Sequence, residues 1–444
     1  MPRFSWIGLL LAFWLMLLCA RSPAQDYRIY EPHPRLMLPP RKLALLQKER
    51  DRQSMRWLQF ESVVKNASEL PEPGLAKALY ARVTGQAAPC LEAVRWALEA
   101  PPDLRQKALV LDWCHELAPE EQIQALALTL ERELEAAEED RSMPAVRGRL
   151  LAAIALAERR PKLTSSQLQA ILGQWWENAA VPALRMSFVS GNRSELFAAC
   201  EMLHAVQDNL KIDLRQPAAD LFQDLPLALL LAYYPAPYPG PRGDVFLPAS
   251  KGASKPDPEQ ALAARAAGLC LVSYDGGSDQ SQFLQGFLMQ DQYLMRDPRG
   301  AVYEFLWANP YRPGLSYHHA PLYFHSRALG ALFARSSWNQ NATWFGYLDG
   351  ELQVFDPDGL KIVTAQPVSK PIQLGGAAVY VAQGQPPGKI QLPAVDTVFF
   401  TGLKPETEYV IEMESTKRFT ESTDRAGLLA INLEGRPRGW IRIR

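Results

Sequence analysis

The spacing of apolar residues changes character once along this chain, and that change limits what it can fold into. From Pro40 to about Arg185, apolar side chains recur at intervals of three and four residues, the period of one buried helix face. Beyond about Leu329, short apolar stretches alternate with polar residues and are separated by Gly, Pro and Asp, which is typical of strands and turns. The sequence therefore predicts a helical part followed by a sheet part.

The helical part is predicted to contain short helices joined by short loops, so neighbouring helices are expected to lie antiparallel. Breaks such as Glu72-Pro73-Gly74 and Pro101-Pro102-Asp103 carry residues that end one helix and begin the next. Repeated helix pairs form either an open solenoid or a closed α/α toroid, and the lack of a fixed repeat length weakens the solenoid. We expect an α/α toroid-like domain, incomplete or closed, over residues 25–328. The aromatic segment 304–326 is expected to be irregular and to line the seam between the two parts.

The sheet part is predicted to be an antiparallel β-sandwich over residues 329–444. Strands are expected at residues 331–335, 343–348, 352–355, 377–382 and 397–400. The Leu-x-Pro-x-Thr-x-Tyr arrangement from Leu403 to Tyr409 resembles the tyrosine corner of fibronectin type III domains. In that motif the phenol bonds backbone a few residues upstream.

The first 24 residues have the pattern of a signal peptide. Arg3 precedes an apolar run from Ile7 to Leu18, and Ser22-Pro23-Ala24 places small residues before Gln25. The run is short for a membrane span, although an uncleaved anchor is the alternative. We therefore expect a secreted or periplasmic protein with no membrane association after cleavage.

Charge and cysteine content exclude several classes of protein. The formal net charge is −1 and no basic stripe is present, so a nucleic-acid partner is not expected. An exported location permits disulfides, and Cys90 with Cys114 either staples neighbouring helices or stays as two buried thiols. The same question is open for Cys200 and Cys270. None of these cysteines has zinc-site spacing, and no metal or cofactor is expected.

The whole layout resembles the heparinase II/III-like polysaccharide lyases, which combine a signal peptide, an α/α body and a C-terminal β-sandwich. Two short stretches carry the resemblance in detail. Pro32-His33-Pro34-Arg35-Leu36-Met37-Leu38 looks like the opening of such chains. Leu332-Phe333-Ala334-Arg335-Ser336-Ser337-Trp338, leading to Ala342-Thr343-Trp344-Phe345-Gly346, is similar to their first sheet-domain strands. The resemblance implies an acidic polysaccharide or another glycan as partner, and β-elimination as the reaction.

Elimination from a uronic acid requires a group that neutralises the carboxylate and a Tyr or His that moves the proton. The resemblance assigns Asn192 to neutralisation. Tyr234 is the candidate for transferring the proton, with His318 or His319 assisting. Arg193 is a candidate for binding a substrate carboxylate. Asn192 has an alternative as a helix N-cap, with Glu195 completing a capping box.

One departure from the family pattern favours a protein that binds glycan, or serves as a scaffold, without catalysis. Active relatives usually carry a histidine-rich motif after the first sheet strands, and this chain has no histidine after His325. Any acid and base must therefore come from the helical part or the seam.

Several further side chains have both a functional and a structural interpretation. Trp307, Tyr311 and Tyr317 are candidate sugar-binding residues, as is the Trp175-Trp176 pair, although such rings more often pack in a core. His204 is expected to be a core histidine bonded to backbone. Glu201-x-x-His204 has the spacing of half a carboxylate-bridged metal motif, but no second copy exists.

Overall fold

The structure is a computed structural model that describes most of the chain. The described residues are 27–29, 32–137, 140–240, 243–252, 257–290, 295, 297–356, 358–363, 370–382, 384–414, 418–435 and 439–444. The predicted signal peptide, residues 1–24, lies outside them. Within the described residues, every helix is too short or too polar to cross a membrane.

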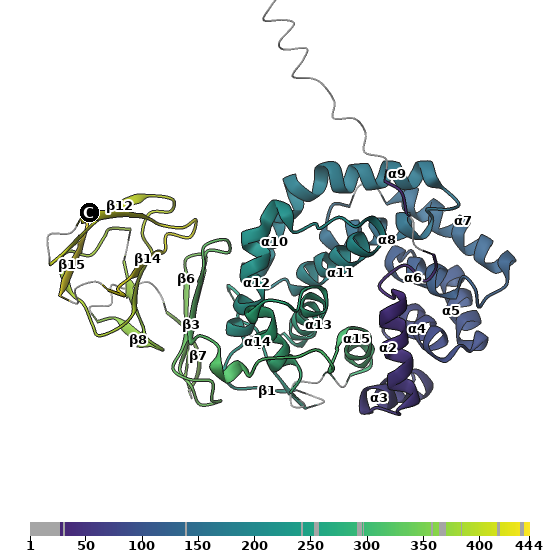
Figure 1. Ribbon diagram of the computed structural model, residues 1–444, viewed down its shortest axis with the longest axis horizontal. Helices are drawn as coiled ribbons and strands as arrows, with labels where there is room; N and C mark the ends of the chain where they lie inside the picture. Colours follow the sequence, from purple (N-terminus) through teal and green to yellow (C-terminus); the bar gives the residue numbers. More distant parts are fainter. Residues whose placement is uncertain are drawn as a thin grey trace, which may run out of the picture.

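Helices make up the first part of the chain, as predicted, and Figure 1 shows them packed side by side. They are α2 (Pro40–Asp51), α3 (Met55–Asn66), α4 (Pro73–Thr84), α5 (Ala87–Glu99), α6 (Leu104–Cys114), α7 (Glu120–Ala136), α8 (Met143–Ala155), α9 (Pro161–Ala170), the π-helix η1 (Ile171–Ala180), α10 (Val181–Ser190), α11 (Arg193–Leu210), η2 (Gln216–Ala218), α12 (Ala219–Ala232), α13 (Pro258–Tyr274), α14 (Asp279–Leu288), α15 (Pro298–Trp307) and η4 (Tyr317–His319).

The predicted helix boundaries coincide with capping residues. Asp103, in the Pro-Pro-Asp break, accepts a hydrogen bond from the Gln106 N–H and so caps α6. Asp297 likewise caps α15, where Pro298 occupies the first helical position. This helix covers the start of the segment 304–326, and residues 323–326 form a strand, so the prediction that this segment is irregular is wrong for both of its ends.

The second part of the chain forms three sheets. The first is an antiparallel meander in the order β3 (Tyr323–Ser326), β4 (Ala331–Arg335), β5 (Trp344–Leu348), β6 (Glu351–Asp356) and β7 (Gly359–Val363). The second has the order β14 (Leu429–Asn432), β11 (Thr397–Thr401), β9 (Ala377–Val381) and β8 (Ile372–Leu374). The third has the order β10 (Ile390–Gln391), β15 (Trp440–Ile443), β12 (Glu408–Met413) and β13 (Arg418–Ser422). A separate hairpin, β1 (Tyr238–Gly240) and β2 (Gly243–Val245), lies within the helical half.

The predicted order, helices and then antiparallel sheets, is confirmed, with one local exception. Strands β9 and β11 pair in parallel, with Thr397 opposite Ala377. Strand β4 has the predicted bounds, whereas β3 begins at Tyr323, ahead of the predicted start of the sheet half at residue 329.

The sheets stack as layers on the helices, and alternate residues of each strand point to opposite sides. On β4, Phe333 belongs to the same core as the helices, whereas Leu332 packs toward the second sheet. On β11, Phe399 packs toward the first sheet and Phe400 toward the third. Figure 1 accordingly shows β3, β6 and β7 next to the helices, and β12 and β15 farthest from them. The central strands β4, β5 and β9 of the first two sheets are therefore buried on both faces.

The predicted tyrosine corner is present. The Tyr409 hydroxyl oxygen accepts a hydrogen bond of 3.3 Å from the Lys404 N–H, five residues upstream. Tyr409 lies at the start of β12 and is buried in the core between the second and third sheets. The motif thus fixes a corner of the outermost layers.

Helix α12 packs against β3 and β4, and we call this contact, with the loop residues 233–240 and 243–250, the seam. The Trp344 indole N–H of β5 donates to the Leu231 carbonyl of α12 (2.8 Å). On the same side, Ser326 donates to Asp224 (2.6 Å). A single apolar core therefore runs from the helices into the first sheet.

Candidate functional site

Asn192 occupies the N-cap position of α11, and its side chain is exposed. Within the described part of the chain it makes no capping hydrogen bond. The Arg193 N–H instead donates to Gln260 Oε1 (2.7 Å), and Glu195 accepts from the Met143 N–H (3.1 Å). The capping box that Asn192 and Glu195 predicted is therefore not formed, and the Asn192 amide is left on the surface.

The surface beside Asn192 is hollowed into a pocket of about 420 Å³, which we call the Asn192 pocket. It is lined by Arg141, Ser142, Met143, Trp175, Ala179, Ala183, Met186, Ser187, Ser190, Asn192 and Glu195. Arg425 from the sheet half borders it, with Nη2 at 3.3 Å from the Met186 sulfur. Burial raises the pKa of the Glu195 carboxyl. An amide, a half-buried indole and two guanidinium groups thus lie in or beside one hollow.

Arg193 does not face this pocket. Its guanidinium is fully buried, where it donates to the Phe188 carbonyl and to the Ala249 carbonyl (2.9 Å) and lies over the Phe188 ring. Burial lowers the pKa of Arg193 to about 10. The side chain therefore ties the end of α10 to the loop before α13, and the prediction that it binds substrate is not supported by its position.

Tyr234 lies in the seam rather than at an open surface. It is 8% exposed, its ring packs on Trp344 and Phe355, and its hydroxyl donates to Gln353 Oε1 (2.9 Å). Burial raises the pKa of the Tyr234 hydroxyl. A phenol that is covered and already paired is poorly placed to take a proton from a polymer.

A short series of contacts links Tyr234 to Gly191, the residue before Asn192. The Gln353 amide that accepts from Tyr234 donates to the Ser250 carbonyl (2.8 Å). Ser250 in turn lies against Gly191, where an added Cβ would come within 2.2 Å of the Ser250 Cβ. Gly191 also has a left-handed backbone (φ 82°), so glycine is required there. These contacts are tightly packed, and they separate an exposed Asn192 from a buried Tyr234.

The histidine pair and its neighbours lie on η4, beyond α14. His318 and His319 are exposed, and the buried Tyr317 stacks on His318 with ring centroids 4.4 Å apart. The Tyr317 hydroxyl donates to Gln290 Oε1 (3.2 Å), and its ring packs on Phe287 and Trp338. Tyr317 thus anchors the segment, while the two imidazoles are exposed to solvent.

The remaining predicted sugar-binding rings, Trp307 and Tyr311, are not among the residues that line the Asn192 pocket. Trp307 is 1% exposed and packs in the helical core against His204 and under the Lys42 ammonium group. Tyr311 is 51% exposed and lies near Lys48 of α2. Trp307 is therefore a core residue here, because no face of its ring is open to a ligand.

The interpretation of His204 as a core histidine is confirmed. Its Nε2 lies 2.9 Å from the Cys270 carbonyl oxygen, and burial lowers the pKa of His204 to about 3. Glu201 belongs to a separate buried network, in which Arg105 (2.7 Å) and Arg147 (2.8 Å) both bind its carboxylate. Because Glu201 is satisfied by two guanidinium groups, it is not a metal ligand in this fold.

A polar cluster that the sequence did not reveal lies at the C-terminal end of α6. We call His33, Asp112, His115 and Glu158 the histidine corner. His33 Nδ1 lies 2.5 Å from Asp112 Oδ1, and the His33 and His115 rings stack with centroids 4.1 Å apart. Burial lowers the pKa of His115, with the neighbouring His33 adding to the effect. The only sequence signal is that His33 lies in the Pro-His-Pro-Arg stretch and His115 directly follows Cys114.

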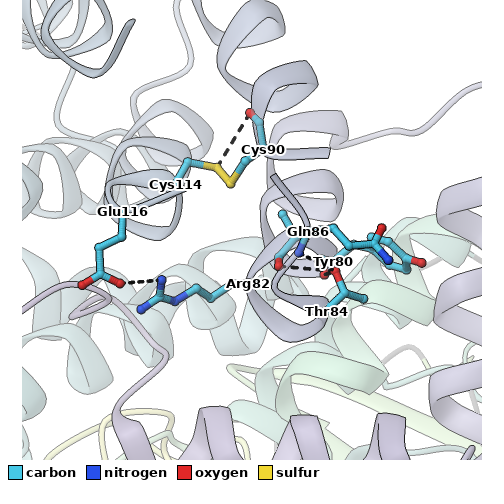
Figure 2. Close-up of a disulfide and its surroundings, with 8 residues drawn as sticks. Tyr80, Arg82, Thr84, Gln86, Cys90, Cys114 and Glu116 are labelled. Atoms are coloured by element: carbon cyan, nitrogen blue, oxygen red, sulfur yellow. Dashed lines mark hydrogen bonds and ion pairs between the residues drawn. A yellow bond between two sulfur atoms is a disulfide. The ribbon is translucent and has the colours of Figure 1, made fainter. Parts of the chain in front are cut away.

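Cys90 and Cys114 form a disulfide that joins α5 to α6, while Cys200 and Cys270 are free and buried. Figure 2 shows the disulfide near the end of α6, with Glu116 just beyond it paired to Arg82 of α4 (2.8 Å). Of the two interpretations left open for Cys90 and Cys114, the disulfide between neighbouring helices is therefore correct. It fixes the helix end on which His115 is placed.

No family model and no curated protein sequence matches this chain. Its function must therefore be inferred from its own residues and their geometry.

Proposed function

We propose that this chain is an exported, heparinase II/III-like protein that binds an acidic polysaccharide in the Asn192 pocket without cleaving it. The observation that carries the proposal is the contrast between Asn192 and Tyr234. Asn192 is exposed in a pocket with an indole and an arginine, whereas Tyr234 is covered and hydrogen-bonded.

The lining of the Asn192 pocket suits a uronate-containing chain. Trp175 offers an aromatic face to a pyranose ring, and Arg141 and Arg425 carry positive charge toward a carboxylate. Asn192 and Ser190 add uncharged groups that can bond to sugar hydroxyls.

Elimination receives less support because the proton-transfer groups are not assembled at this pocket. Tyr234 is buried with a raised pKa, and His318 and His319 lie on η4, next to α14. A lyase requires base, acid and neutralising group around one sugar ring.

Two structural features support the wider proposal. The Cys90–Cys114 disulfide is expected in an oxidising compartment, which agrees with a secreted or periplasmic location. Helices packed as neighbours along the chain, such as α4 with α5 and α6 with α7, are what an incomplete α/α toroid would contain, and the second and third sheets enclose a shared core as in a β-sandwich.

The proposal is tested by measuring binding and cleavage on the same samples. Purified protein lacking residues 1–24 is titrated with alginate, heparosan and chondroitin chains, while ultraviolet absorbance monitors the conjugated double bond that elimination creates. We expect binding of at least one polymer with no rise in absorbance. Trp175→Ala and Asn192→Ala should each weaken binding roughly threefold to tenfold.

Tyr311→Ala is the matched control, because Tyr311 is an exposed ring away from the pocket, and this variant should bind like the wild type. Failure to bind all three polymers would overturn the proposal, and so would binding that Trp175→Ala and Asn192→Ala leave unchanged. A rise in absorbance would refute the non-catalytic assignment and would show that the protein is a lyase.

A further inference from the structure

Three side chains of types that bind transition metals meet at the histidine corner. One ligand atom from each of His33, His115 and Glu158 lies within 4.8 Å of the other two. They come from the loop before α2, the end of α6 and the segment after α8, so the fold alone brings them together. The His33 side chain is only 7% exposed and His115 is half-buried, whereas the Glu158 side chain is 60% exposed, so the cluster is open on the Glu158 side.

Asp112 determines which nitrogen of His33 faces the cluster. Its buried carboxylate accepts hydrogen bonds from the backbone N–H groups of Arg35 (2.9 Å) and Leu36 (2.8 Å), which hold it in place. Because Asp112 Oδ1 also accepts from His33 Nδ1, the neutral ring carries its proton on Nδ1 and has its lone pair on Nε2. A carboxylate behind a histidine is the usual second partner of a metal-binding imidazole.

Glu158 is held in a comparable way. Arg35 Nη2 donates to Glu158 Oε1 (2.6 Å), which leaves Oε2 directed at His33, 4.0 Å from Nε2. Tetrahedral ligands on a zinc ion at the usual bond lengths stand roughly 3.3–3.6 Å apart. A contraction of well under an ångström would bring this oxygen and nitrogen to that separation.

His115 completes the set on a rigid support. It is the C-cap residue of α6 and directly follows Cys114, whose disulfide fixes this end of the helix to α5. Its ring stacks on that of His33, with centroids 4.1 Å apart and an angle of 11° between the planes. Metal binding therefore requires the His115 ring to turn about its side-chain bonds, so that one of its nitrogens points at an ion bound by His33 Nε2.

The geometry points to a binding site for a divalent transition metal, such as Zn²⁺, formed by His33 Nε2, a ring nitrogen of His115 and a Glu158 oxygen. Two imidazoles and one carboxylate are a known zinc ligand set that leaves one position for water or a small ligand. Asp112 and Arg35 act as positioning residues. The inference revises the sequence-based expectation of no metal and is independent of the glycan proposal.

The experiment uses the full mature chain, stripped of metal with a chelator and titrated with ZnCl₂ by calorimetry near neutral pH. The wild type should bind one equivalent. His115→Ala and Glu158→Gln should each weaken binding at least about tenfold. Glu116→Gln is the matched control, since Glu116 is 59% exposed and lies next to His115 without belonging to the cluster. This control should bind as the wild type does.

Co²⁺ provides a second readout that distinguishes a defined site from loose association. The visible spectrum of Co²⁺ added to the wild type should show the intense bands of a four-coordinate ion, and the two ligand variants should lose them. No zinc binding by the wild type would overturn the inference. Equal binding by the wild type, His115→Ala and Glu158→Gln would overturn it as well, and circular dichroism of each variant establishes that it is folded.

Discussion

The seam and the histidine corner both contain imidazole or phenol groups, but they are built in opposite ways. In the seam, the Tyr234 hydroxyl is paired with Gln353 and covered by Trp344 and Phe355. At the corner, Asp112 and Arg35 hold His33 and Glu158 while one side remains open. A polar group that is buried and already hydrogen-bonded stabilises the fold. Anchored groups that keep a free lone pair can instead bind a ligand.

The strongest test of the seam as a structural region is Trp344→Ala. Trp344 is fully buried, packs on Tyr234 and Phe333, and donates to Leu231, so its loss leaves a large cavity. We expect the free energy of unfolding to fall by about 3–5 kcal/mol. Chemical denaturation followed by circular dichroism measures it. Trp175→Ala is the control, because Trp175 lines the surface pocket, and an equal loss in both variants would show that the seam is not a continuous core.

The disulfide behind the corner is expected to give the next largest effect. Replacing Cys90 and Cys114 together with alanine should lower the free energy of unfolding by about 3 kcal/mol, because the unfolded chain is no longer cross-linked. A reducing agent should destabilise the wild type by a similar amount and leave the double variant unchanged. If the reductant destabilised both equally, Cys90 and Cys114 would not be the bonded pair.

Acid should destabilise the protein through His204, which belongs to neither region. The pKa of His204 is about 3 in the folded protein and near 6.5 when unfolded, so the unfolded chain binds more protons between these values. Stability should therefore be steady above about pH 6.5 and fall as the pH drops, by about 2 kcal/mol between pH 7 and pH 5.

Denaturation curves at both pH values check this expectation, with His204→Gln as the comparison. In that variant the acid-induced loss should shrink by most of this amount. If the loss persisted in full, the titrating group would lie elsewhere, and His115 at the corner would be the first residue to replace.

The smallest effect is expected from Tyr234→Phe. This change removes one buried hydrogen bond and leaves Gln353 Oε1 without its donor, which should cost about 1 kcal/mol in the free energy of unfolding. Polysaccharide affinity and zinc affinity should remain those of the wild type. A glycan-cleaving activity that this substitution abolished would contradict the structural role given to Tyr234.

The fold could be predicted from the sequence where the signal is local. Strand β4 was predicted over its whole length because apolar Leu332 and Phe333 stand between small residues in a short stretch bounded by turns. The bond from Lys404 to Tyr409 followed from a motif of seven residues. Helix α15 was missed because Pro298 and Gly300 suggest a break, although proline is favourable at the first helical position after an Asp cap.

The site was harder to predict, because its residues come together only in the folded chain. Asn192 was singled out by resemblance and does line a pocket, but the neighbouring Trp175 was considered only as one of several aromatic residues. His33 and Asp112 are 79 positions apart, and no spacing rule relates them. The burial of Tyr234 and Trp307 also depends on distant segments, so the sequence alone left both the functional and the structural interpretation open.

The layers depend on one another, because the central strands of the first two sheets have no solvent-facing side. Removing the outer strands would uncover Phe400 and Ile431 of the second sheet, and removing all three sheets would uncover the flank of α12. A protein built in this way is difficult to shorten, since each truncation exposes apolar surface and produces an aggregation-prone fragment.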